Sequence, residues 1–547
     1  MIKKLISILL AAVLLLSFSG CGKKPEKNGP TPAPGSTENE EKGSTLRLLY
    51  CANDTLNPYK TISKLNFELS SLMFDPLVKL DNSFGEVFLL AKSVKTEESV
   101  CTVTLSEALF SDGAPLTAED VVFSFGLAKE SERYSHLVKG VKKCEATEDG
   151  AVQFTLEEND PFFYRLLGFP ILKNGSDQLK NEDNVELVPI GTGRFVFSEK
   201  NQKLTPNSKY FGEKPSVTEI TLINAPDSES MEHYVEVGAT DIYYADGGDE
   251  NIIRMSGQKT RANLNNLVYL GINHDYGPLK SDDLRHIISS AISRKQLVSE
   301  AFYSNGVAAT GFFHPEWSVT QGYQTLSDSA NLKICVENLA NIGYNRLNEE
   351  GFYENKSGKI LELDLLVNGD SFVKLSAANL IKKQLGEAGI KINLKKTSSE
   401  QFASALKNGH FQLYLGEIKL NRNMDISSLV LKGGSAAYGM PEAPKKSENK
   451  KDKENKEDEK EEEAAKPEEE EIPEDFDGET SYISVIEGYR KGENSVTDIA
   501  SSLLSSMPVI PLLYRSAVVF YSDEIENIGE VSCYDIFFSA DKYKVKK

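Results

Sequence analysis

The stretch LSEALFSDGAPLTAEDVVFSF, residues 105–125, connects a strand to a helix. Before it, residues 101–105 alternate between apolar and polar side chains, which predicts a strand with one buried face. A turn is expected at Gly113, because glycine tolerates the positive φ that many turns need. Thr117 predicts a helix N-cap, and Asp120, three residues later, predicts a variant of the capping box. The stretch therefore predicts a strand, a tight turn and a helix in succession.

Residues 110–124 resemble, nearly residue for residue, the signature of the family 5 extracellular solute-binding proteins. These are the peptide- and oligopeptide-binding components of ABC importers. The alternative interpretation of residues 110–124 is a generic strand-turn-helix corner without relation to this family. The corner itself is structural and does not touch the ligand. The resemblance implies an α/β, two-lobed periplasmic-binding-protein-like fold of type II, cluster C, with a ligand cleft between the lobes.

Other stretches resemble the same family, in the same order along the chain. They are residues 53–59, residues 189–197, residues 282–294 (with Ser293 in place of the usual Asp) and residues 507–514. Together the resemblance covers residues 45–440 and 480–547. It implies lobe I at residues 45–266, lobe II at residues 267–507, and a return segment at residues 508–547 that completes lobe I.

Periodicity supports this division. Residues 267–273 predict a hinge strand into lobe II, and an amphipathic pattern predicts a long helix from Ser281. Residues 361–367, 371–387 and 389–394 read as strand, helix and strand, a unit that implies a parallel pair of strands.

The first 20 residues predict a lipoprotein signal peptide, with two lysines followed by an apolar run. The run ends at Cys21 in a pattern that resembles a bacterial lipobox, so Cys21 is expected to be acylated. Acylation would anchor the chain to the outer face of the cell membrane. The alternative is ordinary cleavage without a lipid. Residues 21–44 are rich in Gly, Pro, Lys, Glu, Ser and Thr and predict a flexible tether.

The net charge of −21 argues against nucleic-acid binding, which needs a basic face. Part of this charge lies in residues 445–479, which hold 8 Lys and 17 Asp or Glu. Residues 441–479 therefore predict a disordered acidic insertion at a loop tip of lobe II. The alternatives are a solvated single helix and a role in binding cations or cell wall.

The 6 Cys and 6 His show no CxxC, HExxH or i,i+4 His pair, so neither a metal site nor a cofactor is expected. A buried thiol is expected at Cys101, and a disulfide is not excluded. GxSxG and Walker A motifs are also absent from the sequence, so no enzyme activity is expected.

The resemblance also implies where a ligand would bind. In peptide-binding members, a carboxylate in a stretch approximating Trp-x-x-Asp takes the ligand's amino terminus, while protein main chain pairs with the ligand. Residues 417–425 read EIKLNRNMD here and contain no Trp, so Asn421 or Arg422 falls where the Asp is expected. The candidate ligand contacts of this stretch are Glu417, Lys419, Asn421, Arg422 and Asp425.

Arg422 would suit a carboxylate or another anionic group through paired hydrogen bonds, and the alternative is a surface residue. Tyr438 follows Gly-Gly-Ser where family members often bring a loop to the cleft; otherwise it is a plain loop tyrosine. The first-lobe loop adds the candidates Asn53, Thr55 and Asn57, which could instead be structural.

The function expected is that of a monomeric, lipid-anchored protein that captures peptides or similar small solutes and delivers them to an ABC permease. A protein of the same fold that no longer serves transport, such as a peptide-signal receptor or an envelope interaction protein, is the alternative. A secreted enzyme is the third hypothesis, and it would need a nucleophile and base in the cleft.

Overall fold

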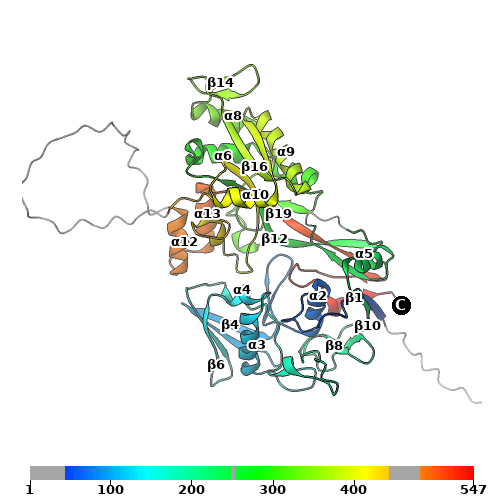
Figure 1. The fold of residues 1–547 in the computed structure, drawn as a ribbon. Helices are drawn as coiled ribbons and strands as arrows, with labels where there is room; N and C mark the ends of the chain where they lie inside the picture. The colour runs from blue at the N-terminus through cyan, green and yellow to red at the C-terminus, as the bar shows by residue number, and fades with distance from the viewer. Residues whose placement is uncertain (1–43, 248–252, 443–480, 547) are drawn as a thin grey trace, which may run out of the picture. The chain divides into compact units, whose positions relative to one another are not determined.

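The fold is built on three sheets of four or more strands (Figure 1). The computed structural model describes residues 44–247, 253–442 and 481–546, and from Gly43 onward the chain forms one compact unit. The predicted signal peptide, Cys21 and nearly all of the predicted tether lie outside the described residues, as do residues 443–479 of the predicted insertion.

The first sheet has the strand order β1-β10-β9-β8. Its strands are β1 (Ser44–Tyr50), β10 (Val217–Asn224), β9 (Lys203–Pro206) and β8 (Phe195–Ser198). The pair β1 and β10 is parallel, and the other two pairs are antiparallel. The parallel pair joins strands more than 160 residues apart in the chain, so this sheet depends on a long-range contact.

The second sheet is antiparallel, with the order β4-β5-β7-β6. Its strands are β4 (Ala91–Glu97), β5 (Val100–Leu105), β7 (Val152–Leu156) and β6 (Val141–Ala146). The strand predicted before the opening stretch is β5, and Cys101 is fully buried on it, as expected.

The third sheet has seven strands in the order β11-β19-β12-β18-β16-β17, and β13 pairs with β19. Its strands are β11 (Ile242–Ala245), β19 (Ile510–Tyr521), β12 (Gln258–Ile272), β18 (Leu413–Lys419), β16 (Glu362–Asn368), β17 (Lys391–Thr397) and β13 (Gly306–Ala308). The predicted parallel pair is confirmed, because β16 and β17 run parallel and α9 connects them.

Helices and short ladders complete the described chain. The helices are α2 (Lys64–Met73), α3 (Ala118–Glu130), α4 (Ser135–Val138), α5 (Ser228–Glu236), α6 (Asp282–Ser290), α7 (Arg294–Gln296), α8 (Leu332–Asn341), α9 (Phe372–Glu387), α10 (Ser399–Lys407), α11 (Ser427–Val430), α12 (Tyr482–Arg490) and α13 (Val496–Ser506). Two-stranded ladders pair β2 (Val78–Leu80) with β3 (Glu86–Phe88), β14 (Arg346–Leu347) with β15 (Tyr353–Glu354), and β20 (Ile525–Asn527) with β21 (Lys544–Val545).

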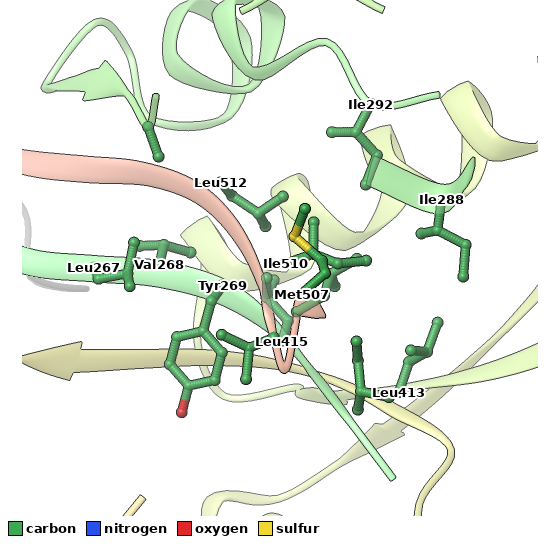
Figure 2. Close-up of a cluster of buried hydrophobic side chains, with 14 of the residues drawn as sticks. Leu267, Val268, Tyr269, Ile288, Ile292, Leu413, Leu415, Met507, Ile510 and Leu512 are labelled. Carbon is green, nitrogen blue, oxygen red and sulfur yellow. The ribbon is translucent and has the colours of Figure 1, made fainter. Parts of the chain in front are cut away.

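Two long neighbouring strands, β12 and β19, share two hydrophobic clusters, to which both supply residues. Leu267 and Tyr269 of β12 and Ile510 of β19 belong to the larger cluster, part of which Figure 2 shows. Ala262 of β12 and Ala517 of β19 belong to the other cluster, which also contains β1 and α2. The register of the two strands shifts between these regions, so an irregular stretch of ladder lies where the chain passes from one core to the next.

The corner at residues 105–125 has the predicted local structure. Gly113 has a φ of 89°, which confirms the turn. The amide and hydroxyl of Thr117 both donate to a carboxylate oxygen of Asp120, at 2.9 and 2.8 Å, so the two residues cap α3. The other carboxylate oxygen of Asp120 accepts a hydrogen bond from the Asn174 amide, at 2.8 Å. The cap therefore also ties α3 to a segment 54 residues away.

The long helix predicted from Ser281 is wrong in its length, because α6 ends at Ser290. Ser293 takes an extended conformation and caps α7 by accepting from the Gln296 amide. The next residue, Arg294, is 2% exposed and donates to the carbonyl of Pro511 at 2.8 Å. The chain therefore leaves α6 after Ser290, and Arg294 is buried against β19 instead of extending that helix.

Glycine is required at residues 191 and 193 by close approach rather than by positive φ. A Cβ on Gly193 would lie 2.3 Å from the carbonyl carbon of Met73, and one on Gly191 would lie 2.3 Å from the Met73 oxygen. The Gly193 amide donates to that same oxygen at 2.9 Å. Neither glycine has a positive φ, so these residues let the segment pack directly on the end of α2.

Candidate ligand-binding site

Two cavities are each lined in part by residues 419–425, within the stretch that the sequence singles out. The first, called the Arg422 cavity, has a volume of about 340 Å³ and is lined by Lys419 and Arg422. The second, called the Asp425 cavity, has a volume of about 500 Å³ and is lined by Asn421 and Asp425. Both volumes are typical of small-molecule sites.

Elements of both predicted lobes line the Arg422 cavity. From predicted lobe I come α2, the segments at residues 133–134 and 168–170, the end of β11, and residues 533–536 of the return segment. From predicted lobe II come the end of β18 and the loop after it. The charged and aromatic side chains of the lining include Lys64, Glu68, Arg133, Tyr244, Lys419, Arg422 and Tyr534.

The loop that carries Arg422 is fixed by hydrogen bonds from residues far away in the chain. Asn265, which is fully buried on β12, donates from its side chain to the carbonyls of Leu420 and Asn421 at 3.4 and 3.1 Å. Arg165 donates from Nε to the carbonyl of Arg422 at 2.8 Å. The backbone of the loop is therefore positioned before any ligand arrives.

The Arg422 side chain lies in a narrow space. Its guanidinium sits 4.5 Å from the centre of the Tyr534 ring. A Cβ on Gly168 would come within 1.6 Å of Nη1, so the guanidinium occupies the place that a larger residue 168 would fill. Among the described residues, no carboxylate lies within 4 Å of Arg422 or of Lys419. Two cations that no carboxylate of the described chain approaches within 4 Å therefore face this cavity, an arrangement that suits a ligand carboxylate.

Glu417 is already neutralised by protein cations. It forms ion pairs with Lys374 and with Arg515, the latter at 3.1 Å, and accepts from the Asn266 side chain at 3.0 Å. Burial alone would raise the pKa of Glu417, but the two cations outweigh it and lower the pKa to about 2. The structure thus gives this carboxylate a partner inside the protein, and it lines neither cavity.

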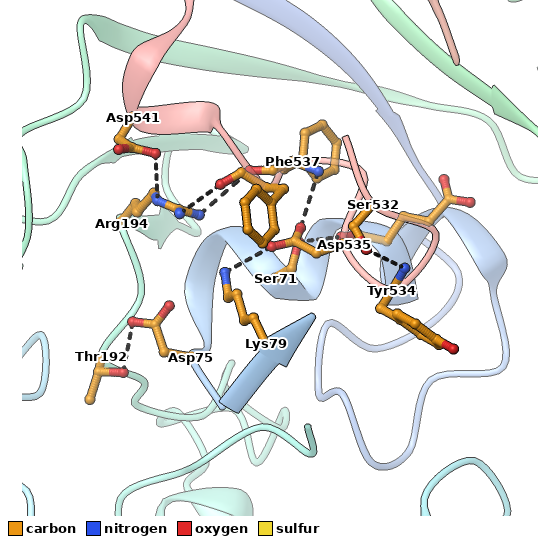
Figure 3. Close-up of polar contacts among 12 residues, drawn as sticks. Ser71, Asp75, Lys79, Thr192, Arg194, Ser532, Tyr534, Asp535, Phe537 and Asp541 are labelled. Carbon is orange, nitrogen blue, oxygen red and sulfur yellow. Dashed lines mark hydrogen bonds and ion pairs between the residues drawn. The ribbon is translucent and has the colours of Figure 1, made fainter. Parts of the chain in front are cut away.

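One wall of the Arg422 cavity rests on a buried polar network (Figure 3). Lys79 Nζ lies 2.8 Å from Asp535 Oδ2, and each side chain is only 6% exposed. Arg194 lies 3.4 Å from Asp541 and donates to the carbonyl of Phe538 at 3.0 Å. Burial would raise the pKa of Asp535, but Lys79 and Arg194 outweigh it and lower the pKa. The network fixes the return segment against β2.

The remaining predicted contacts lie elsewhere. Asn421 and Asp425 line the Asp425 cavity. The loop before α2 places Asn53, Thr55 and Asn57 outside both cavities; Asn57 is 2% exposed, and its side chain accepts from the Tyr59 amide at 3.0 Å. Tyr438 also lies outside both cavities, with its ring 6.2 Å from that of Tyr414.

Sequence reasoning missed Glu68 on α2. Its side chain is 15% exposed, and Oε1 is buried without a hydrogen-bond partner, 3.9 Å from Lys64 Nζ. Burial raises the pKa of Glu68 to about 8, with Lys64 opposing the shift and Asp246 adding to it. One signal was available, because Glu68 falls on the face of α2 that also presents Leu65, Leu69 and Leu72.

Glu68→Gln should change how stability depends on pH. Because the pKa of Glu68 is about 8 in the folded protein and 4.5 ordinarily, the folded state holds the proton more tightly. The stability of the wild type should therefore fall relative to that of the variant from about pH 4.5 to about pH 8, and the difference should then stay constant. Urea unfolding midpoints of the ligand-free proteins at pH 5, 6, 7, 8 and 9 measure this. If the unfolding midpoints of the two proteins changed in parallel with pH, Glu68 would not have the raised pKa assigned to it here.

Within the described residues, no group of three His, Cys, Asp or Glu side chains could hold a metal ion. Each described cysteine is a free thiol; these are Cys51, Cys101, Cys144, Cys335 and Cys533. No helix of the described chain is both long enough and apolar enough to cross a membrane.

Comparison with known proteins identifies the family. Residues 87–439 match the model of the bacterial extracellular solute-binding proteins, family 5, middle region, which covers more than half of the chain. The chain belongs to this family. The oligopeptide-binding protein AppA of Bacillus subtilis is 26% identical to this family 5 protein over 71% of this chain and 75% of AppA. The nickel-binding periplasmic protein of Escherichia coli is 25% identical over 65% of this chain and 71% of its own.

Solved structures show the same fold. An ABC transporter substrate-binding protein from Sinorhizobium meliloti superposes with a TM-score of 0.67 at 16% identity, over 92% of this chain and all of the other. This family 5 protein therefore has the predicted two-lobed, α/β periplasmic-binding-protein-like fold of type II. The family is one of extracellular solute-binding proteins of transporters, so a solute-binding role follows from membership.

Proposed function

We propose that this family 5 protein captures peptides or similar small solutes in the Arg422 cavity and delivers them to an ABC permease. It binds its ligand without turning it over. The observation that carries the assignment of the cavity is the pair Lys419 and Arg422, which face it with no carboxylate of the described chain within 4 Å. A ligand carboxylate would supply the missing anion.

The geometry supports binding between the lobes. Arg422 comes from the loop after β18, whereas Tyr534 and Gly168, which its guanidinium contacts, come from predicted lobe I. A carboxylate seated here would add contacts to both sides. Closure of two lobes on a ligand is a hinge motion, and the irregular ladder between β12 and β19 is a suitable place for it.

Arg422→Ala should weaken binding of a ligand with a carboxylate by about 1.5–3 kcal/mol, as expected for a lost charged hydrogen bond. Isothermal titration with peptides that raise the melting temperature of the wild type measures the loss. Asn421→Ala is the matched control, because its side chain lines the Asp425 cavity. A second variant, Gly168→Ala, should also weaken binding, since its Cβ would displace the guanidinium.

Three outcomes would contradict the proposal. If no member of a diverse peptide library raises the melting temperature, peptides are not the ligand. If Arg422→Ala leaves the affinity unchanged, or if Asn421→Ala weakens binding more, the ligand does not use the Arg422 cavity. If the protein converts any library member chemically, it is an enzyme.

We also propose that the protein is a monomer held to the cell membrane by a lipid on Cys21, which lies outside the described residues. The lipobox-like sequence supports this anchor. Growth with labelled palmitate should label the wild type and leave Cys21→Ser unlabelled. Label on the Cys21→Ser variant would place the lipid elsewhere.

The alternative function, a same-fold protein outside transport, draws support from the stretch after β18. Its acid Glu417 is paired with Lys374 and Arg515, and its next acid, Asp425, faces the other cavity. A peptide that binds the purified protein but is taken up equally by cells lacking the gene would favour this alternative over import.

A further inference from the structure

We propose that Glu68 of α2 receives the ammonium group of the ligand, while Arg422 and Lys419 receive its carboxylate. The inference deepens the proposed function and rests on it. It assigns to this protein a short ligand that carries both charges, with its positive end held by predicted lobe I. The three residues line one cavity of about 340 Å³, Glu68 from α2 and the two cations from the end of β18 and the loop after it.

Glu68 has a carboxylate oxygen, Oε1, that is buried and accepts no hydrogen bond from the described chain. Its one ion-pair contact among the described residues is a long one, to Lys64. Lys64 Nζ, one turn earlier on α2, is 3.9 Å from Oε1, and that ammonium lies 4.8 Å from the centre of the Tyr244 ring. Buried polar atoms almost always find a partner, so an unpartnered oxygen in the wall of a cavity indicates a group that arrives from outside.

The charges around Glu68 favour a cation over an anion as that group. Asp246, at the end of β11, lines the same cavity and adds a second negative charge near Glu68. The charged groups that act on Glu68 are thus Lys64 from its own helix and Asp246 from the neighbouring strand end. Because burial holds the Glu68 pKa near 8, the carboxyl carries its proton at neutral pH until a cation replaces that proton.

The cationic pole of the cavity, Lys419 and Arg422, comes from a part of the chain far from Glu68. Arg422 and Lys419 have no carboxylate partner among the described residues, and Arg133, also on the wall, donates to the carbonyls of Thr61 and Ile62. A ligand with only one charge would leave the other pole unsatisfied. A short peptide with a free amino group and a free carboxyl group satisfies both.

Binding of the ammonium group then releases the proton of the Glu68 carboxyl group. At pH 7 the ligand ammonium is mostly protonated, and Glu68 holds its proton as a carboxylic acid. As the ammonium docks, the O–H bond of Glu68 breaks and the proton passes to the buffer. A carboxylate–ammonium pair forms. Close to one proton should therefore be released for each ligand bound.

The test uses the full chain and two tripeptide sets of the same sequences, one with free amino termini and one N-acetylated. The wild type should bind the free set more tightly, by about ten- to a hundredfold, the range of a charged hydrogen bond. Glu68→Gln should remove most of this preference and leave affinity for the acetylated set within about threefold. Glu232→Gln, an exposed residue of α5, is the matched control and should keep the preference.

Titration calorimetry at pH 7 in phosphate and in Tris supplies a second measurement. The wild type should release a proton on binding free tripeptides, and Glu68→Gln should not. Equal binding of both sets by the wild type would overturn the inference but leave the proposed function standing, provided Arg422→Ala still weakens both. Binding of neither set would overturn both. A preference that survives in Glu68→Gln would place the ammonium elsewhere and overturn the inference.

Discussion

Lys79→Ala should cost about 3–5 kcal/mol of unfolding free energy, because it leaves the buried Asp535 carboxylate without its cation. The two side chains are 6% exposed each and lie 2.8 Å apart, so the variant would keep a largely buried carboxylate that has lost its nearest cation. The pair joins β2 to the return segment, which also lines the Arg422 cavity (Figure 3). Urea unfolding followed by circular dichroism measures the loss.

A surface pair provides the control for Lys79→Ala. Lys95 and Glu97 form an ion pair with side chains 72% and 69% exposed, so Lys95→Ala should change stability by less than about 1 kcal/mol. The double variant Lys79→Ala with Asp535→Asn should recover part of the loss, because the buried charge is gone. Equal effects of Lys79→Ala and Lys95→Ala would show that the network contributes little.

Arg165→Ala should be comparably destabilising, by about 3–5 kcal/mol, and should also weaken ligand binding. The Arg165 side chain is fully buried, pairs with Glu86 at 3.0 Å, and donates to the carbonyls of Phe84 and Arg422 at 2.6 and 2.8 Å. Removing it leaves these acceptors unsatisfied beside a void. Since one of the acceptors is the backbone of Arg422, the loop that presents the ligand cation loses a support.

The expected loss of ligand binding distinguishes a role of Arg165 in positioning the Arg422 loop from a role in stability alone. Arg165→Lys keeps the charge but not the fork of donors, so it should retain part of the stability and still weaken binding. Arg490→Ala, which removes a partly exposed pair with Glu158, is the control and should do neither. Binding by Arg165→Ala at wild-type affinity, at a temperature where it is folded, would show that the loop holds its place without Arg165.

The fold was predictable because its determinants are local and ordered in sequence. The pair Thr117 and Asp120 and the turn at Gly113 can be read from neighbours a few residues apart, and their arrangement also resembles one family. The break after Ser290 was not predictable in this way. It is accompanied by a hydrogen bond from the buried Arg294 to the carbonyl of Pro511 on β19, more than 200 residues later in the chain.

The candidate site was harder to predict from the sequence, because it too depends on contacts between distant parts of the chain. The resemblance directs attention to residues 417–425, but which of them shares a cavity depends on how the loop turns after β18. Asn265 and Arg165 set that turn from distant parts of the chain, and Met424 takes a positive φ of 61° within it. Neighbouring residues 421 and 422 therefore line different cavities.

The two ends of the described chain meet at one short segment. Ser216 donates from its hydroxyl to the carbonyl of Tyr543, and Thr218 donates to the carbonyl of Ser44 at 3.1 Å. A brief linker could therefore join residue 546 to residue 44, and the chain could be reopened at the exposed turn of residues 355–359. Such a circular permutant would keep every sheet while reversing the order in which its halves are synthesised.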